Sequence, residues 1–276
     1  MYDKIEKIGQ TVLQHGCYNN RIYLMKLAFQ DKDMIVDKLD DLAAQHNYSK
    51  IFCKVPGWAA FPQEHYQQEA HIPKFYNGNE DARFLAKYND PARQKITPDN
   101  KQKMADILNV ARSKGTKKNR DLAPCFALRE LDTHDVLSLT ELYAAVFKTY
   151  PFPIFEPTFI KKTMEQHIRY FGVFSQGRLV AASSAEMDKQ GQNVEMTDFA
   201  TLPGFSGNGL ASYLLRMMEQ EMKKEGMITA YTIARALSPG MNITFSKNGY
   251  QFGGVLINNT NIFSGLESMN VWYKYL

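Results

Sequence analysis

The chain has few cysteines for its 276 residues: Cys17, Cys53 and Cys125 lie far apart and show no C-x-x-C spacing. An odd number of widely separated cysteines argues against a disulfide framework and a cysteine metal site, and favours a reducing compartment. Membrane signals are lacking too, since no apolar run approaches the roughly 18 residues of a spanning helix and the charged N-terminus has no signal-peptide core. We therefore expect a soluble, cytoplasmic protein that binds no metal and does not cross a membrane.

Charge of one sign is also scarce, because the formal net charge is only +4. Much of it comes from the basic run Lys114–Arg120, which has no interleaved aromatic residues and is typical of a solvated linker rather than a nucleic-acid surface. Two phosphate-binding signatures are absent: G-x-x-x-x-G-K-[ST], and the third glycine of a dinucleotide-binding fingerprint. These absences disfavour nucleic-acid partners, a P-loop nucleotide site and a Rossmann site.

What the chain does have is one stretch, Glu195–Ala211, around which the rest can be organised. Its first part has the β-branched and apolar residues of a strand, and Pro203-Gly204 interrupts it. Gly207 and Gly209 follow, and then a segment with helical periodicity begins. A strand, a glycine turn and a helix N-terminus form an anion cradle, because the first helical N–H groups and the positive dipole end point at the ligand.

The predicted elements over residues 125–276 run in the order β-α-α-β-β-β-α-β-α-β-β. A Pro- and charge-rich segment, residues 89–120, separates this part from the first half, so we predict two units, 1–120 and 121–276. The halves also resemble each other, since Phe61–Gln67 aligns with Phe245–Gln251 in similar surroundings. Because the first half lacks the glycine turn, we expect it to be structural or to form a homodimer. A short helix is expected at Pro62–Ala70.

The sequence S-G-N-G-L-A at 206–211 resembles the Q/R-x-x-G-x-G/A motif of the GNAT superfamily of N-acetyltransferases, and the element order matches that fold. Longer strings, among them T-Y-P-F-P-I (149–154), A-Y-T-I-A-R-A-L-S-P-G-M-N (230–242) and F-Y-N-G-N-E-D-A (75–82), are similar to the β-lysine N-acetyltransferase family over nearly the whole chain. The resemblance implies a mixed α/β GNAT fold, with a partial GNAT-like N-terminal half. It implies transfer of acetyl from acetyl-CoA to the side-chain amine of β-lysine, whose product serves as a compatible solute in that family.

The resemblance also implies the catalytic carboxylates. Glu195 occupies the position of the general base in many family members, and a protonated amine needs such a base before it can attack a thioester. Asp198 lies three residues later, so ideal strand alternation points it to the opposite face unless a β-bulge intervenes. No Cys–His pair suggests a covalent intermediate, which fits direct attack by the amine.

Coenzyme A contacts are implied for backbone groups of the strand end, for the glycine turn with the first helical residues, and for Asn242 at the start of a later helix. The strand and turn residues are Phe199, Ala200, Thr201, Ser206, Gly207, Asn208, Gly209, Leu210 and Ala211. Two departures from the family stand out: Ser206 replaces the usual Arg or Gln, and Phe245 replaces a Tyr that often acts as general acid. Tyr231 and Tyr250 offer other hydroxyl groups, or they are core aromatics.

Candidate substrate residues come from three places. Arg235 could bind the carboxylate of β-lysine in a bidentate manner. Asn258, Asn259 and Asn261 could bind the carboxylate or the β-amine, or could belong to a polar turn. Tyr150 and Phe152 could line the methylene chain or pack in the core.

Three alternatives stay open. They are acetylation of another small amine such as lysine or a polyamine, a coenzyme A-binding protein without catalysis, and an RNA-associated module.

Overall fold

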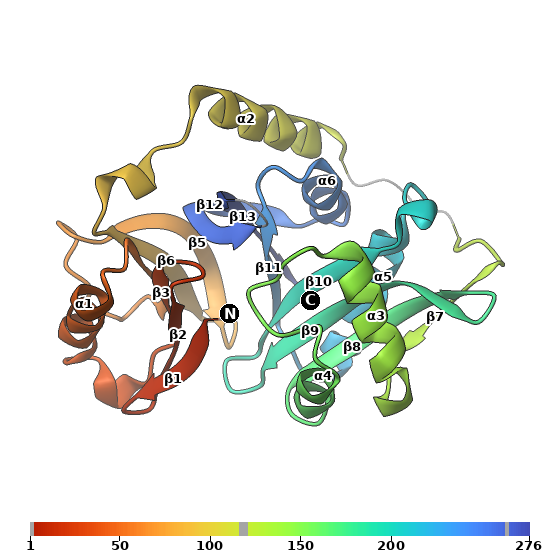
Figure 1. Ribbon diagram of the computed structural model, residues 1–276, viewed down its shortest axis with the longest axis horizontal. Helices are drawn as coiled ribbons and strands as arrows, with labels where there is room; N and C mark the ends of the chain where they lie inside the picture. The colour runs from red at the N-terminus through yellow and green to blue at the C-terminus, as the bar shows by residue number, and fades with distance from the viewer. Residues whose placement is uncertain (1–2, 116–120, 263–264) are drawn as a thin grey trace.

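The computed structural model of the chain describes residues 3–115, 121–262 and 265–276. One mixed 13-stranded sheet runs through both halves in the order β1-β2-β3-β4-β6-β5-β12-β13-β11-β10-β9-β8-β7 (Figure 1). The predicted boundary at residue 120 and the end of the basic run lie outside the described residues, and the division into two domains stays a prediction.

The described residues before position 89 contain six strands and one α-helix. Its elements are β1 (Lys4–Ile8), β2 (Thr11–Gly16), β3 (Arg21–Lys26), α1 (Ile35–His46), β4 (Lys50–Pro56), β5 (Gln67–Tyr76) and β6 (Glu80–Tyr88). Strands β3 and β4 are parallel and α1 connects them. The helix ends where Asn47 adopts a left-handed conformation, at φ 54°. The prediction of a short helix at Pro62–Ala70 is wrong, because residues 67–70 belong to β5.

The second half follows the predicted element order. Its elements are β7 (Phe126–Glu130), α3 (Val136–Val146), α4 (Pro157–Met164), β8 (Ile168–Ser175), β9 (Arg178–Asp188), β10 (Asn193–Thr201), α5 (Leu210–Lys224), β11 (Thr229–Arg235), α6 (Pro239–Lys247), β12 (Gln251–Ile262) and β13 (Gly265–Tyr275). Strands β10 and β11 are parallel and α5 connects them. The order β2-β3-β4-β6-β5 of the first half thus repeats β9-β10-β11-β13-β12 of the second.

Helices cover both faces of the second half. Strand alternation explains the arrangement, because Ser183 contacts Met218 of α5 whereas its neighbour Ser184 contacts Asp198 on the opposite face. Helices α3 and α4 lie on that second face (Figure 1). The helix α5 buries an apolar stripe that includes Leu210, Leu214 and Met218.

The two halves meet at a seam between β5 and β12, where Gly254 pairs with Ala70. At Gly254 φ is +145°, and a Cβ atom there would lie 2.3 Å from the carbonyl oxygen of Glu69, so only glycine fits. Aromatic and aliphatic side chains of both halves form one buried cluster beside the seam, with Phe52 and Phe84 from the first half and Tyr231 and Val271 from the second.

A further helix, α2 (Pro98–Ser113), passes over the top of both halves in Figure 1. Its C-terminal part packs on the second half, since the Ser246 hydroxyl of α6 donates to the Ala111 carbonyl at 2.8 Å. The guanidinium of Arg112 stacks over the Phe252 ring at 4.8 Å. The segment after the first half is thus docked on the second half.

Candidate active site

The anion cradle lies between the end of β10 and the start of α5. A short 3-10 turn, η4 (Pro203–Phe205), leads into exposed residues at 206–209, and Gly209 is the helix N-cap. Gly207 and Gly209 have φ of +85° and +70°, and a Cβ at Gly207 would meet nothing within 4 Å. The positive φ, rather than crowding, therefore explains these glycines.

The N–H groups of the first turn of α5 have no partner within the helix, so the cradle suits a phosphate approached from solvent. The side chain of Asn208 donates to the Phe205 carbonyl at 3.0 Å and holds the turn. Ser206 is exposed and carries no charge. An anion bound here would be held by backbone groups and the dipole of α5 rather than by a basic side chain of the turn.

Strands β10 and β11 separate beside the cradle. In the described part of the chain, their parallel ladder ends at Glu195 and Tyr231, although both strands continue. Residues 200 and 201 keep their ladder with β9 on the other side. The backbone of Phe199, Ala200 and Thr201 therefore faces a gap in the sheet, which suits an extended ligand that adds to the strand edge.

Glu195 lies at the point where the two strands separate. Tyr231 donates its hydroxyl to the Glu195 carboxylate at 2.9 Å, and Lys54 of β4 donates to the Tyr231 oxygen at 2.7 Å. Burial raises the pKa of Glu195 from the ordinary 4.5 to about 7; the charge of Lys54 opposes this rise, and that of Glu186 adds to it. Such a carboxylate is suited to accept a proton at neutral pH.

Asp198 lies on the same face as Glu195 because a bulge interrupts strand alternation. The β9–β10 register shifts between Thr197 and Ala200, and Asp198 has φ +55°. The hydroxyls of Tyr150 and Ser184 both donate to its carboxylate, and burial raises its pKa. Both of its oxygens thus accept hydrogen bonds from the protein, so the arrangement favours a positioning role for Asp198 over proton transfer.

The loop before α4 supplies the predicted aromatic side chains. The pKa of Tyr150 is raised by burial and by the charges of Asp198 and Glu195, so its phenol lies close to both carboxylates. Its ring also contacts Phe147 at 4.9 Å between centroids. Phe152 is partly buried against the main core. Of the two predicted wall residues, Tyr150 is thus the one with a direct contact in the site.

Phe245 is fully buried and packs edge-on against Phe199, with ring centroids 5.6 Å apart. It therefore supports the strand at the bulge and supplies no proton. The two tyrosines considered in its place differ in position. Tyr231 is bonded to Glu195, whereas Tyr250 lies near Glu219 of α5, whose charge adds to the effect of burial on its pKa.

Asn242, a predicted coenzyme A contact, lies in the interior of the second half. Its side chain is fully buried, donates to the carbonyls of Arg235 and Ser238, and accepts hydrogen bonds from Asn270 and Trp272. All four hydrogen-bonding positions of the amide are used within the protein. The side chain of Asn242 therefore serves the packing of α6 on β11 and β13, and a contact of this residue with coenzyme A stays a prediction.

The predicted carboxylate-binding residue, Arg235, is already paired. Its guanidinium makes two hydrogen bonds to Glu267, at 2.9 and 2.6 Å, and its side chain is 48% exposed. A bidentate contact to a substrate carboxylate would have to break this pair. The arrangement therefore speaks against Arg235 as the carboxylate ligand.

The three candidate asparagines on β12 lie at the seam between the halves. The side chain of Asn258 donates to the carbonyls of Arg93 and Lys95, and that of Asn261 donates to the Tyr18 carbonyl. Asn259 is buried, and its carbonyl accepts from Arg21. The side chains of Asn258 and Asn261 thus hold the first half against β12, whereas the buried side-chain oxygen of Asn259 has no hydrogen-bond partner among the described residues. A substrate role for the three residues stays a prediction.

Sequence reasoning missed the contribution of the first half. Lys54 contacts Tyr231, and the pKa of Tyr23 on β3 is raised by burial and by the charges of Glu195 and Glu186. The first half is thus more than the structural or dimer-forming unit predicted for it. A signal existed in the sequence, since Lys54 is a charged residue inside the apolar strand I-F-C-K-V.

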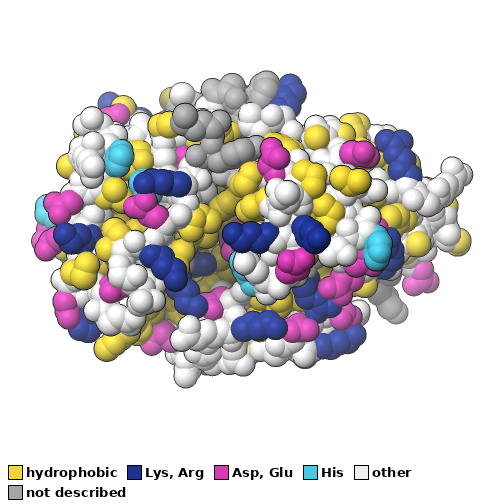
Figure 2. Space-filling view, turned by 60° about the horizontal axis from the view of Figure 1, so that its bottom comes forward, with side chains coloured by type: hydrophobic (Ala, Val, Ile, Leu, Met, Phe, Trp, Pro, Cys, Tyr) yellow, Lys and Arg dark blue, Asp and Glu magenta, His cyan; other side chains and the backbone are white. Residues whose placement is uncertain are grey.

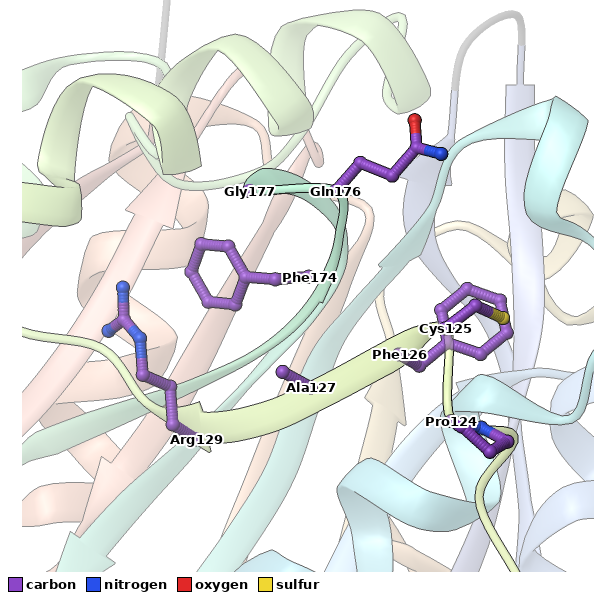
Figure 3. A pocket seen from close by; sticks show the side chains of 8 residues that line it. All are labelled: Pro124, Cys125, Phe126, Ala127, Arg129, Phe174, Gln176 and Gly177. Atoms are coloured by element: carbon purple, nitrogen blue, oxygen red, sulfur yellow. The ribbon is translucent and has the colours of Figure 1, made fainter.

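Figure 2 shows a hollow near the middle of one face, with hydrophobic side chains inside it and basic and acidic side chains around it. A separate pocket of about 410 Å³ lies at the β7 edge of the sheet and is lined by Phe126, Arg129 and Phe174 (Figure 3). Arg129 there is paired with Asp135 at 2.7 Å, and this pocket shares no residue with the carboxylate site.

Two further properties bear on ligands. Across the three described ranges, no group of three or more His, Cys, Asp or Glu side chains is placed to hold a metal ion. Among the same residues, no helix has both the length and the apolar composition needed to cross a membrane.

Comparison with known proteins places the chain in a family. Residues 136–238 match the acetyltransferase (GNAT) family model. A β-lysine N(6)-acetyltransferase of Methanococcus maripaludis is 40% identical over 99% of this chain and 98% of its own length. The N-acetyltransferase YodP of Bacillus subtilis is 33% identical over the full length of both chains.

A β-lysine N(6)-acetyltransferase of Methanosarcina mazei is 32% identical over 76% of this chain and 84% of its own length. The family match covers α3 to β11 and so includes Glu195, the bulge and the glycine cradle. Fold, site and full-length similarity agree: the chain belongs to the GNAT family of N-acetyltransferases.

Proposed function

We propose that this chain transfers the acetyl group of acetyl-CoA to the N6 amine of β-lysine (3,6-diaminohexanoate). The similarity to two proteins named β-lysine N(6)-acetyltransferase supports the choice of amine. The observation that carries the chemistry is Glu195, whose carboxylate has a pKa of about 7 and lies where β10 and β11 separate.

Glu195 removes the proton that blocks the reaction. A primary ammonium is protonated at neutral pH and has no lone pair for attack. A carboxylate with a pKa near 7 takes up that proton, directly or through a water molecule, far better than one with the ordinary pKa. The neutral amine then attacks the thioester carbonyl carbon, the C–N bond forms, and the C–S bond breaks with release of the thiolate.

The residues of the cradle bind the donor. The first-turn N–H groups of α5 and the turn at 206–209 receive the pyrophosphate, and the strand edge at 199–201 pairs with the amide groups of the pantetheine arm. Phe245 offers no proton to the departing thiolate, so this step proceeds without an acid from that position.

A second candidate is a polyamine substrate, favoured by the charges around the site. Glu186, Glu195 and Asp198 lie close enough to affect one another, and Arg235 is occupied by Glu267. Such a site attracts a molecule with two ammonium groups. β-Lysine has two as well, and the two candidates differ in whether a carboxylate is present.

A panel of amines distinguishes these functions. Purified protein is mixed with acetyl-CoA and β-lysine, α-lysine, putrescine or spermidine, and free thiol and acetylated product are measured. We expect the highest kcat/KM for β-lysine and acetylation at N6. A higher value for a polyamine would replace the substrate, and no thiol release with any amine would make the protein a non-catalytic binder.

We place the reaction in the cytoplasm. Cys53 and Cys125 are free thiols, which fits a reducing compartment.

A further inference from the structure

The connection between the halves at the carboxylate site involves a single cationic side chain. Lys54 lies on β4 of the first half, and its neighbours Cys53 and Val55 point into the core under α1. By strand alternation Lys54 points the other way, towards the second half. Its ammonium lies 2.7 Å from the Tyr231 hydroxyl and 4.9 Å from the centre of that ring.

Tyr231 is held between two charged groups. Its oxygen accepts from Lys54, so its own proton points to Glu195, 2.9 Å away. The ring is buried and contacts Phe75 and Phe84 of the first half, with centroids 5.0 and 6.5 Å apart. The phenol can therefore neither rotate away nor reverse its hydrogen bond while Lys54 is charged, and Glu195 has a fixed orientation.

We propose that Lys54 is a positioning residue that keeps the Glu195 carboxylate charged and oriented, through Tyr231, so that the first half sets the reactivity of the second. The proposal rests on the proposed function, because Glu195 must act as the base. Without a cation, a carboxylate buried beside others tends to keep its proton and cannot take one from the amine.

The other groups that face Glu195 do not favour its charged form by their own charge, so this effect falls to Lys54. They come from β3, β9, β10, β11 and the loop before α4. They are Tyr23, Glu186, Asp198, Tyr231 and Tyr150. The two carboxylates among them oppose the charge on Glu195, and the three phenols stay neutral because their pKa values are raised well above the ordinary one by burial. Lys54 is the cation whose charge lowers the pKa of Glu195.

The first test reads the titration of Glu195 without catalysis. Protein labelled with ¹³C at the glutamate carboxyl group is titrated by NMR, and the Glu195 resonance is identified by its loss in Glu195→Gln. In Lys54→Met the midpoint should move up by about one unit or more, as expected when a nearby opposite charge is removed. An unchanged midpoint would overturn the proposal even if the protein acetylates no tested amine.

The second test uses the pH profile with the best amine of the panel. The acid limb of kcat/KM should move to higher pH in Lys54→Met, with kcat falling at pH 7 and recovering at high pH. Lys54→Arg should restore the limb, because it keeps the charge. A purely structural role would instead lower activity equally at every pH and would contradict the proposal.

A matched control is Lys26→Met. Lys26 also links the halves, through a pair with Asp188 at 3.0 Å, but its side chain is 50% exposed and has no contact with Tyr231 among the described bonds. In Lys26→Met we expect no shift in the titration midpoint of Glu195 and none in the acid limb of kcat/KM. If Lys54→Met fails to fold, Lys54→Gln provides the same measurement, since it also removes the charge, and an unshifted midpoint in that variant overturns the proposal.

Discussion

Glu195→Gln should make the protein more stable at alkaline pH while abolishing acetyl transfer. The pKa of Glu195 is about 7 in the folded chain against an ordinary value of 4.5. The folded state therefore binds this proton more tightly than the unfolded state does. The resulting stabilisation is complete below pH 4.5 and is lost as the pH rises through 7, where the folded protein must hold a charged carboxylate.

The size of the effect follows from the pKa difference. At about 1.4 kcal/mol per pKa unit, a rise from 4.5 to about 7 corresponds to at most about 3.5 kcal/mol at pH 8. Two effects reduce this value: Glu195 keeps part of its surface exposed, and its replacement leaves the charge of Lys54 less well compensated. We therefore expect Glu195→Gln to gain about 1–3 kcal/mol of unfolding free energy at pH 8. At about 2–4 °C per kcal/mol, the melting temperature at pH 8 should rise by about 2–12 °C.

The assay is thermal unfolding of parent and variant between pH 5 and pH 8, followed by circular dichroism. The difference in melting temperature should be small at pH 5 and should grow as the pH approaches 8. Glu64→Gln is the control for the loss of a surface carboxylate, because Glu64 is exposed. An equal difference at pH 5 and pH 8 for Glu195→Gln would refute the assignment of a raised pKa to this residue.

Three further changes test other parts of the structure. Ser206→Gln should lower the KM for acetyl-CoA about two- to tenfold, because it adds one hydrogen bond to the ligand. Ser206→Ala should leave this KM unchanged. If Ser206→Gln has the same KM as the parent protein, that result would contradict the cradle. Asn242→Ala should lower the free energy of unfolding by about 3 kcal/mol, measured by urea denaturation, because the donors of Asn270 and Trp272 lose their acceptor. Gly254→Ala should lower the free energy of unfolding by at least about 3 kcal/mol in the same assay, because φ +145° and the Glu69 carbonyl exclude a Cβ. A smaller loss would mean that the backbone of the seam can adjust.

The cradle could be predicted from the sequence because everything that forms it is local. Gly207 and Gly209 take the positive φ values that the turn needs, and Leu210 begins the apolar stripe of α5 within a few residues. Short-range patterns contain this information in full. The choice of Glu195 as the general base comes instead from the family resemblance, and its catalytic role stays a prediction.

The surroundings of the carboxylates could not be predicted in the same way. A bulge at Asp198 changes which face a side chain occupies, and its cause lies in the pairing with β9 rather than in residues 195–198. Lys54 and Tyr231 are 177 positions apart and meet only through the sheet order. The asparagines of β12 had a polar composition suited to a substrate, but their partners on the first half are visible only in the fold.

The seam at Gly254 has a consequence for the order in which the protein is made. Ala70 leaves the ribosome long before Gly254, so β5 is the open edge of a partial sheet during most of synthesis. An unpaired edge of this kind is a template for association with other chains. The nascent first half should therefore depend on chaperones until β12 emerges, and the carboxylate site can form only after almost the whole chain has been translated.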